Sequence, residues 1–207
     1  MLTVLWAVVG GTACWGTPPV IVDFSPPARQ YRASEYHDVY ERWTRHEKIM
    51  VEVDAALEVW TTYKSQEFRE AFVAHYADTY AMNDDATESL RRAQHEAGTA
   101  AYEFVVTGQS SNYKWNDLEK KSSPWRVLLL DGAGHELVPE QITVERYPDL
   151  FEREFYPAKT PFSKTYLIRF TRAPGHDDGW KGERTGEIRL RFAGPRGRGD
   201  LRWADRP

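Results

Sequence analysis

Hydrophobic residues recur at a helical spacing along one stretch near the start of the chain. One set recurs every seven residues and consists of Tyr36, Trp43, Met50 and Leu57. A second set follows three residues after each of these and consists of Val39, His46, Val53 and Trp60. Apolar residues at two such heptad positions line one face of an α-helix. The pattern therefore predicts one long helix from Ser34, its N-cap, to Lys64.

Two shorter helices are expected next. The apolar positions change phase after Ser65, a suitable N-cap, and become Phe68, Phe72, His75 or Tyr76, and Tyr80. Asn83, Asp84 and Asp85 then mark a break and a new cap. The third helix ends at Gly98 and carries Ala86, Leu90, Ala93 and Ala97. Antiparallel packing would bury the aromatic stripes, so an N-terminal helical hairpin or bundle is predicted.

From Thr99 onward the hydrophobic period changes to two, which is typical of strands. Gly- and Pro-containing turns separate about seven short apolar segments. The segments are Tyr102–Thr107, Trp125–Leu130, Ile142–Val144, Phe151–Tyr156, Thr165–Arg172, Ile188–Phe192 and Leu201–Trp203. Short strands at this density favour an antiparallel immunoglobulin-like β-sandwich. The expected fold class is α+β, with the helices first and the sandwich after them.

The first residues of the chain carry a separate signal. Leu2 to Val9 is apolar and uncharged, Gly10 to Ala13 are small, and Cys14 follows as the only cysteine. A stretch of this length matches the apolar part of a secretory signal and is shorter than a membrane span. Thr12-Ala13-Cys14 resembles the end of a bacterial lipobox, although Gly11 stands where that pattern usually has Leu. The alternative is a buried N-terminal strand with Cys14 as an inert thiol.

The lipobox resemblance implies a division of the chain. Residues 1–13 would be a signal peptide, and residues 14–33 an acylated Cys14 followed by a proline-rich tether. Within the tether, Val20 to Phe24 is apolar enough to pair as an edge strand. Residues 34–98 are the expected helical region and 99–207 the sandwich-like region, with 34–207 forming one compact unit. Trp15 is not the Asp that retains lipoproteins in the inner membrane, so the resemblance implies an outer-membrane lipoprotein facing the periplasm.

Composition and charge restrict the partners. The 207 residues are 41% hydrophobic and 28% charged, which is ordinary for a folded domain. Residues 33–98 carry 7 basic and 14 acidic side chains, whereas residues 150–207 carry 13 basic and 8 acidic ones. The net charge of −4 argues against nucleic acid as a partner. A single cysteine excludes an intramolecular disulfide.

Candidate chemistry in the sequence is weak. His37 and Glu41 lie one helical turn apart, but a lone pair of this kind is a poor metal site, and His46 falls on the apolar stripe. His176-Asp177-Asp178 lies in a Gly-containing loop without the spacing of a calcium-binding EF-hand. No Gly-x-Ser-x-Gly sequence surrounds Ser110, Ser111, Ser122 or Ser123. No catalytic residue, metal or cofactor is therefore predicted.

The sequence favours a non-enzymatic, lipid-anchored envelope protein that acts as a binding or adaptor module. Its expected partners are the membrane, through Cys14, and an envelope protein or polysaccharide. Residues suggested for the binding surface are Trp43, Trp60, Tyr76, Arg189 and Arg191. The alternative is a small-molecule or polysaccharide-binding protein with an aromatic pocket between the helices and the sheet. A metal-dependent hydrolase is the least favoured reading.

Overall fold

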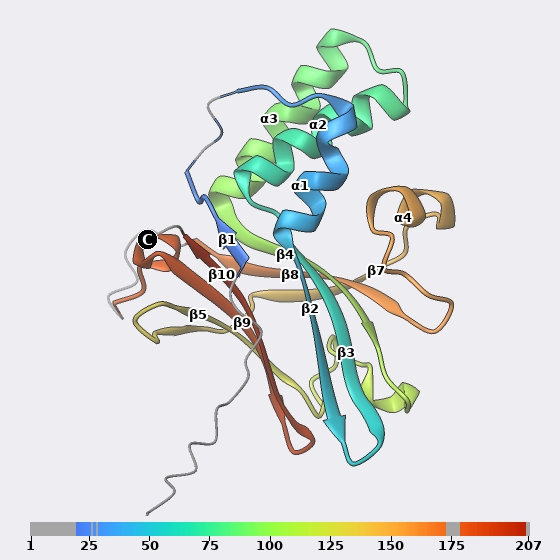
Figure 1. The fold of residues 1–207 in the computed structure, drawn as a ribbon, viewed down its shortest axis with the longest axis vertical. Helices are drawn as coiled ribbons and strands as arrows, with labels where there is room; N and C mark the ends of the chain where they lie inside the picture. The colour runs from blue at the N-terminus through green and yellow to red at the C-terminus, as the bar shows by residue number, and fades with distance from the viewer. Residues whose placement is uncertain (1–19, 26, 28, 173–178, 206–207) are drawn as a thin grey trace, which may run out of the picture.

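A computed structural model describes residues 20–25, 27, 29–172 and 179–205. Within them the chain is mixed α/β, with four α-helices and two mostly antiparallel sheets (Figure 1). The helices are α1 (Tyr36–Trp43), α2 (Gln66–Thr79), α3 (Asp84–Ala100) and α4 (Asp149–Phe155). Short 3-10 turns are η1 (Ala33–Glu35), η2 (Tyr113–Trp115) and η3 (Gly182–Thr185).

One sheet has the strand order β1-β10-β9-β5-β6 and the other β2-β3-β4-β8-β7. The strands of the first are β1 (Val20–Val22), β5 (Arg126–Asp131), β6 (Glu136–Leu137), β9 (Glu187–Gly194) and β10 (Gly197–Asp205). Those of the second are β2 (Thr44–Val51), β3 (Asp54–Tyr63), β4 (Ala101–Gln109), β7 (Gln141–Glu145) and β8 (Lys164–Thr171). Three of the pairs, β2–β3, β5–β6 and β9–β10, join strands that are adjacent in the chain through short turns, and β1 joins β10 in parallel.

The two sheets share a hydrophobic core. Trp203 of β10 packs against Phe104 of β4 and Tyr63 of β3, with ring centroids 5.4 Å and 6.1 Å apart. All three side chains are fully or almost fully buried. Alternate residues of each strand point into this core, as the pleat requires. Helices α1, α2 and α3 lie beyond one end of the strands (Figure 1), which leaves the opposite end to loops and hairpin tips.

The prediction of one helix over 34–64 is wrong beyond Trp43. The chain leaves α1 there and forms the hairpin β2–β3, turning at Glu52 and Val53. The predicted helical face would have buried Met50 and Val53, which are 46% and 89% exposed. β3 instead buries the alternating residues Leu57, Val59, Thr61 and Tyr63. Residues with β-branched or aromatic side chains favour that pleated arrangement, and it prevailed over the heptad spacing. Region 34–98 thus contains two strands as well as helices.

The segment Phe151–Tyr156 was expected to be a strand and forms α4 instead. Phe151 and Phe155 are one helical turn apart, and their rings stack with centroids 4.6 Å apart. Pro148 immediately precedes the helix, where its missing N–H has no cost. Contacts between residues four apart therefore outweigh the short apolar pattern that resembled a strand.

Three local predictions are confirmed. Ser65 caps α2, because its side chain accepts a hydrogen bond from the Phe68 N–H at 3.1 Å. Asn83 caps α3 by accepting from the Ala86 N–H at 2.9 Å. Val20–Val22 pairs as an edge strand, with Val20 opposite Trp203. Residues Leu2 to Val9 and Cys14, on which the lipoprotein prediction depends, lie outside the described part of the chain. Within that part, no helix combines the length and apolar character that a membrane crossing requires.

Candidate functional site

A cleft of about 620 Å³ lies near the end of the second sheet that faces away from α1, α2 and α3. Its size falls within the range of ~300–1,000 Å³ that ligand sites occupy. The start of β3, the end of β4, the segment up to η2 and the start of β8 contribute its walls. The lining residues are Ala55, Glu58, Gln109, Ser110, Ser111, Tyr113, Asn116, Phe162 and Lys164.

Phe162 is held out into solvent by a hydrogen-bonded loop. Its side chain is 85% exposed. Thr160 and Ser163 bracket it, because the Thr160 N–H donates to Ser163 Oγ at 2.9 Å and Ser163 Oγ donates to Thr160 O at 2.8 Å. The hydrogen bonds of this loop therefore fix the backbone on either side of the exposed ring.

Tyr113 presents a second ring at the same cleft. It is 79% exposed and opens η2. Asn112 caps that turn by accepting a hydrogen bond from the Lys114 N–H at 3.1 Å. The Asn112 N–H in turn donates to Ser110 Oγ at 3.3 Å. Local hydrogen bonds therefore order the backbone that carries Tyr113, and ordering before binding lowers the entropy lost on binding.

A chain of polar contacts runs along one wall. Gln109 Nε2 donates to Glu58 Oε2 at 2.8 Å, while Gln109 Oε1 accepts from Thr160 Oγ1 at 3.0 Å. The other oxygen of Glu58 lies 3.0 Å from His46 Nε2. These contacts connect the loop that carries Phe162 to the two strands β3 and β2. The amide of Gln109 and the carboxylate of Glu58 are thus fixed in orientation.

Glu58 is the acidic group of the cleft. Burial acts to raise the pKa of its carboxyl group, but hydrogen bonds from Gln109 and His46 and the charge of Lys48 outweigh that effect. The pKa of Glu58 is consequently lowered, and the group is ionised at neutral pH. Its charge is used within the protein rather than left free for a cationic ligand.

The basic group of the cleft is also partnered. Lys164 Nζ donates to the Asn116 carbonyl oxygen at 2.7 Å and lies 3.6 Å from Glu119. The Asn116 side chain donates to Gly108 O at 2.7 Å and accepts from the Tyr166 hydroxyl at 3.0 Å. A Cβ at Gly108 would lie 3.0 Å from Asn116 Oδ1, so this close approach suits glycine. The floor of the cleft is therefore a closed hydrogen-bonded unit.

The cleft borders one of the suggested surface residues. Trp60 lies two residues beyond Glu58 on the same face of β3, about 7 Å along the strand. Its half-buried indole stacks on His46 of β2, with centroids 4.6 Å apart and planes 20° apart. His46 was expected on an apolar helical face, whereas it is an exposed strand residue. Trp60 and His46 thus extend the polar wall of the cleft across the sheet.

A smaller cavity of about 340 Å³ shares Lys164 with the cleft. Its most buried member is Glu152 of α4, which accepts a hydrogen bond from Thr165 Oγ1 at 2.7 Å. Lys159 forms an ion pair with the same carboxylate. A buried carboxylate that is paired in this way fixes α4 against β8. The pair therefore explains the structure of this cavity without a ligand.

Trp43 does not belong to a binding surface, contrary to expectation. It is fully buried, and its indole N–H donates to Glu67 Oε2 at 2.7 Å. Tyr76 is half-buried in an aromatic cluster between α2 and α4, with Phe155 5.7 Å away. Neither residue lines the two cavities described above. The structure therefore does not bring Trp43, Trp60 and Tyr76 together in one pocket.

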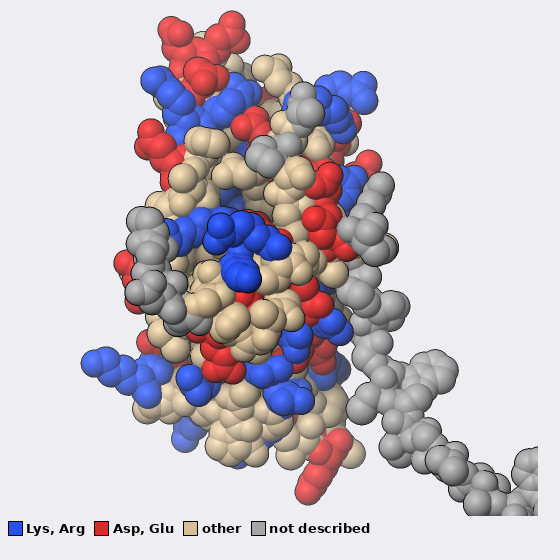
Figure 2. Space-filling view, turned by 90° about the vertical axis from the view of Figure 1, so that its left-hand side faces the viewer, with Lys and Arg blue, Asp and Glu red and all other residues tan. Residues whose placement is uncertain are grey.

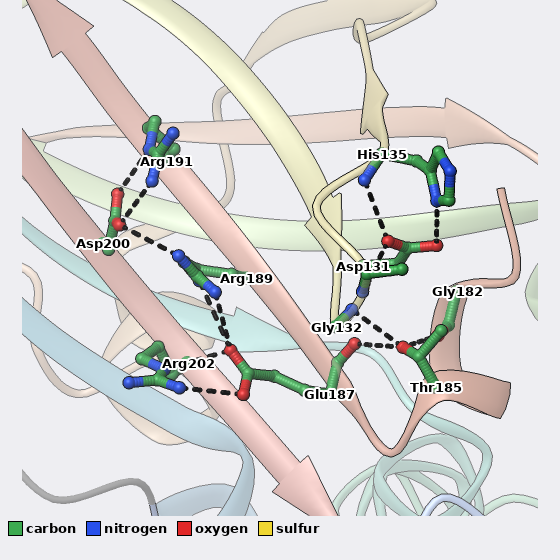
Figure 3. Close-up of polar contacts among 11 residues, drawn as sticks. Asp131, Gly132, His135, Gly182, Thr185, Glu187, Arg189, Arg191, Asp200 and Arg202 are labelled. Carbon is green, nitrogen blue, oxygen red and sulfur yellow. Dashed lines mark hydrogen bonds and ion pairs between the residues drawn. The ribbon is translucent and has the colours of Figure 1, made fainter. Parts of the chain in front are cut away.

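Arg189 and Arg191 lie on the outer face of the other sheet, where acidic partners occupy them (Figure 3). Arg191 makes two hydrogen bonds of 2.8 Å to Asp200. Arg189 lies 3.1 Å from Glu187, which also pairs with Arg202 at 2.8 Å. This ladder crosses β9 and β10 and belongs to a different surface from Trp60. The two arginines suggested for the binding surface are thus already paired with carboxylates of the protein itself.

The surface retains the charge asymmetry of the sequence. Figure 2 shows carboxylates at the very top of the molecule, where α2 and α3 meet, with Lys and Arg side chains directly below them and both signs of charge further down. Exposed acids at this helical end are Asp78, Asp84, Asp85 and Glu88. The cleft lies at the opposite end of the strands from these acidic side chains. Because salt screens charges over such a distance, they contribute little to the electrostatic potential at the cleft.

Within the described part of the chain, the residues considered for metal binding and nucleophilic catalysis make other contacts. Among them, no group of three or more His, Cys, Asp or Glu side chains is arranged to hold a metal ion. His37 contacts the His75 ring, with centroids 5.9 Å apart, instead of forming a site with Glu41. The hydroxyls of Ser110 and Ser111 donate to the carbonyls of Ala56 and Ala55, at 2.8 Å and 3.0 Å. His176-Asp177-Asp178 lies outside the described residues.

Sequence reasoning missed the two residues that define the cleft, Tyr113 and Phe162. Each is a large aromatic residue in a segment of turn-forming residues, Ser110-Ser111-Asn112 before one and Pro161 before the other. An aromatic ring in such a segment has no strand or helix face on which to be buried. That context is the available signal, and it lies outside any periodic apolar pattern.

Comparisons with known proteins do not place the chain in a family. No family model matches the sequence, and no curated protein matches it. A crystal structure described as a novel protein of unknown function from Burkholderia pseudomallei K96243 is similar to it, at 10% sequence identity and a TM-score of 0.44. The match covers 84% of this chain and 89% of that one, and a similarity at this level carries no functional conclusion.

Proposed function

We propose that this protein is a non-enzymatic, lipid-anchored binding protein of the cell envelope, and that the cleft at the end of the second sheet is its recognition site. The observation that carries the proposal is the exposure of Tyr113 and Phe162 on two ordered segments at one cleft. Two exposed rings cost solvation free energy in the isolated protein, and a bound ligand recovers it. The fixed polar groups beside them would supply specificity.

The anchor in this proposal is an acylated Cys14. Because β1 pairs with β10 from Val20 onward, only the six residues from Cys14 separate the lipid from the folded domain. Fully extended, six residues span at most ~20 Å. Such an anchor would hold the domain close to the membrane surface, whereas a tether running to residue 33 would let it stand further away. Stable anchoring takes more than one acyl chain.

Two measurements test the anchor. Intact-mass analysis of the native protein is expected to show a chain that begins at Cys14 and carries added acyl mass. The Cys14→Ser protein is expected to leave the membrane fraction for the soluble fraction. A native chain that begins at Met1 with a free thiol would overturn the anchor, and it would leave the recognition site untouched.

A ligand screen tests the recognition site. Thermal unfolding of the full chain would be followed with neutral oligosaccharides, amino acids and short peptides as probes. A probe that binds at the cleft raises the unfolding temperature of the native protein. The rise should be lost in Phe162→Ala and kept in Leu150→Ala, which removes an exposed apolar side chain from α4. A rise of equal size in both variants would place binding elsewhere.

The finer description of the fold is also a proposal. We infer an antiparallel sandwich of immunoglobulin-like architecture with a helical hairpin at one end. The shared core of the two sheets supports the sandwich, since Phe104 and Trp203 meet between them. The contact of α2 with α3 supports the hairpin, since Arg91 Nε lies 3.1 Å from Glu70. Peptide-level hydrogen exchange would test both, because a sandwich core should exchange as one cooperative unit.

A further inference from the structure

We propose that the ligand of the cleft is a neutral oligosaccharide. This inference rests on the proposed recognition site and names the chemical class that fits it. Three properties of the lining residues favour this class: the aromatic rings, the hydrogen-bonding groups and the charge balance. Each part is a property of described side chains.

The rings of Tyr113 and Phe162 supply flat apolar surfaces at the mouth of the cleft. A pyranose ring has a face of C–H groups that packs on an aromatic ring, while its hydroxyls point outward around the edge. A purely apolar ligand would also use the rings, but it would cover the polar wall without satisfying its remaining hydrogen-bonding capacity. Covering polar atoms in this way costs solvation free energy, so the wall selects against such a ligand.

The polar groups of the cleft retain unused hydrogen-bonding capacity. Gln109 has donated one of its two amide hydrogens, to Glu58, and keeps the other. Ser111 donates its hydroxyl to the Ala55 carbonyl, so its oxygen can still accept. Free donors and free acceptors therefore lie side by side. A sugar hydroxyl both donates and accepts, and it can satisfy both kinds of group at once.

The charges of the cleft balance internally. Glu58 is bonded to Gln109 and His46, and Lys164 is bonded to Asn116 and lies near Glu119. Neither the Glu58 carboxylate nor the Lys164 ammonium group therefore needs an opposite charge on the ligand. An anionic ligand would meet the carboxylate of Glu58, and a cationic ligand would meet Lys164. A neutral ligand avoids both repulsions, which favours a neutral saccharide over a charged one.

The stacked pair of His46 and Trp60 lies along β3 from Glu58 and offers a further surface. A ligand longer than one sugar unit could contact the cleft and this pair together. We therefore infer that the ligand is an oligosaccharide and not a single sugar.

Isothermal titration calorimetry on the full chain tests this inference. The probes are neutral hexasaccharides of glucose, mannose, xylose and N-acetylglucosamine, with a hexasaccharide containing uronic acid and an apolar peptide for comparison. At least one neutral hexasaccharide should bind, and more tightly than the uronic acid probe. Tyr113→Ala and Phe162→Ala should each weaken binding about tenfold, the scale of one lost aromatic contact. Tyr113→Phe keeps the ring and should change affinity by less than about twofold.

Leu150→Ala is the matched control and should bind as the native protein does. Circular dichroism of every variant would confirm the native fold before titration. The inference is overturned if the folded native protein binds none of the neutral hexasaccharides, or if it binds them equally well without either ring. If the apolar peptide binds instead and depends on Phe162, the saccharide class is wrong while the recognition site stands. If no probe's binding depends on Tyr113 or Phe162, the recognition site fails as well.

Discussion

His46 and Trp60 occupy directly paired positions on β2 and β3, and their rings stack with centroids 4.6 Å apart. Cross-strand aromatic pairs stabilise a hairpin by up to ~1 kcal/mol. Because the β2–β3 turn at Glu52 and Val53 is exposed, the pair also fixes the hairpin that carries Glu58. The stability of this hairpin therefore bears directly on the geometry of the cleft.

The first prediction concerns that stack. Trp60→Ala should lower the free energy of unfolding by about 1–2 kcal/mol, since it removes a half-buried ring and its partner contact. Trp60→Phe should cost less, because a smaller ring can still stack on His46. Urea denaturation at neutral pH measures both values. Equal losses in the two variants would show that the stack with His46 does not stabilise the hairpin.

The second prediction concerns Gln109, which joins Glu58 to Thr160. Gln109→Ala breaks both hydrogen bonds and should loosen the loop that presents Phe162. Hydrogen exchange of the peptide covering residues 160–164 should become faster, while exchange in α3 stays unchanged. Gln141→Ala, an exposed glutamine of β7, is the control and should leave the loop as it is. Unaltered exchange in Gln109→Ala would mean that Thr160 and Ser163 hold the loop without Gln109.

The third prediction separates core from surface. Trp43→Phe removes the indole N–H that donates to Glu67 and leaves a buried carboxylate short of one donor. The free energy of unfolding should fall by about 1–3 kcal/mol, which is the cost of an unsatisfied buried group. Ligand affinity at the cleft should not change. A loss of ligand affinity without a loss of stability would contradict this prediction and would indicate that Trp43 takes part in binding.

The fourth prediction concerns Asp131, whose side chain is fully buried beside His135. Its Oδ1 accepts hydrogen bonds from the N–H groups of Ala133 and His135, both at 3.0 Å, and its Oδ2 accepts from Lys181 N–H at 3.0 Å (Figure 3 shows the His135 contacts). Asp131→Asn would place an amide N–H₂ group against one of these donors. Urea denaturation should show a loss of about 1–3 kcal/mol. A loss no larger than that of the exposed control Glu136→Gln would contradict the prediction.

The fifth prediction is a pH dependence of stability that arises from the arginine ladder. Burial acts to raise the pKa values of Glu187 and Asp200, but Arg202 and Arg191, with Arg189, outweigh it and lower both. Carboxyl groups with pKa values lowered by folding contribute stability above their unfolded values, about 4, and lose it as pH falls through the lower folded values.

Denaturation in urea between neutral pH and pH 3 tests this dependence. The native protein should lose stability toward the acid end. The double variant Glu187→Gln, Asp200→Asn should be less stable at neutral pH and should lose less on acidification. Parallel pH profiles for the two proteins would show that the ladder does not contribute.

Several local features followed from the sequence because their causes lie within a few residues. Ser65 and Asn83 cap their helices through N–H groups three residues on, and the alternation in β9 places Ile188 and Leu190 in the core. The helix predicted through residue 64 failed for the opposite reason. Heptad spacing and alternation both fit residues 44–63, and only pairing with β4, a strand far along the chain, decides between them.

The cleft could not be predicted in the same way. About fifty residues of sequence separate Glu58 from Gln109, and about fifty more separate Gln109 from Phe162. The pairing of distant strands brings them to one wall of the cleft. Glu58 and Gln109 are ordinary surface residue types, and the one sequence signal, the aromatic residue Phe162 in a turn-forming segment, does not indicate which other residues lie beside it.

The sequence by itself determined the caps at Ser65 and Asn83, most strand positions and the edge pairing of Val20–Val22. The lipid address at Cys14 stays a prediction. These depend on local hydrogen bonds, on side-chain periodicity and on short motifs. The tertiary structure alone decided that Trp43 is a core residue, that Arg189 and Arg191 are paired, and that Tyr113 and Phe162 meet at one cleft. The physical reason is that burial, ion pairing and convergence depend on which strands become neighbours, and that choice minimises the free energy of the whole chain rather than of any segment.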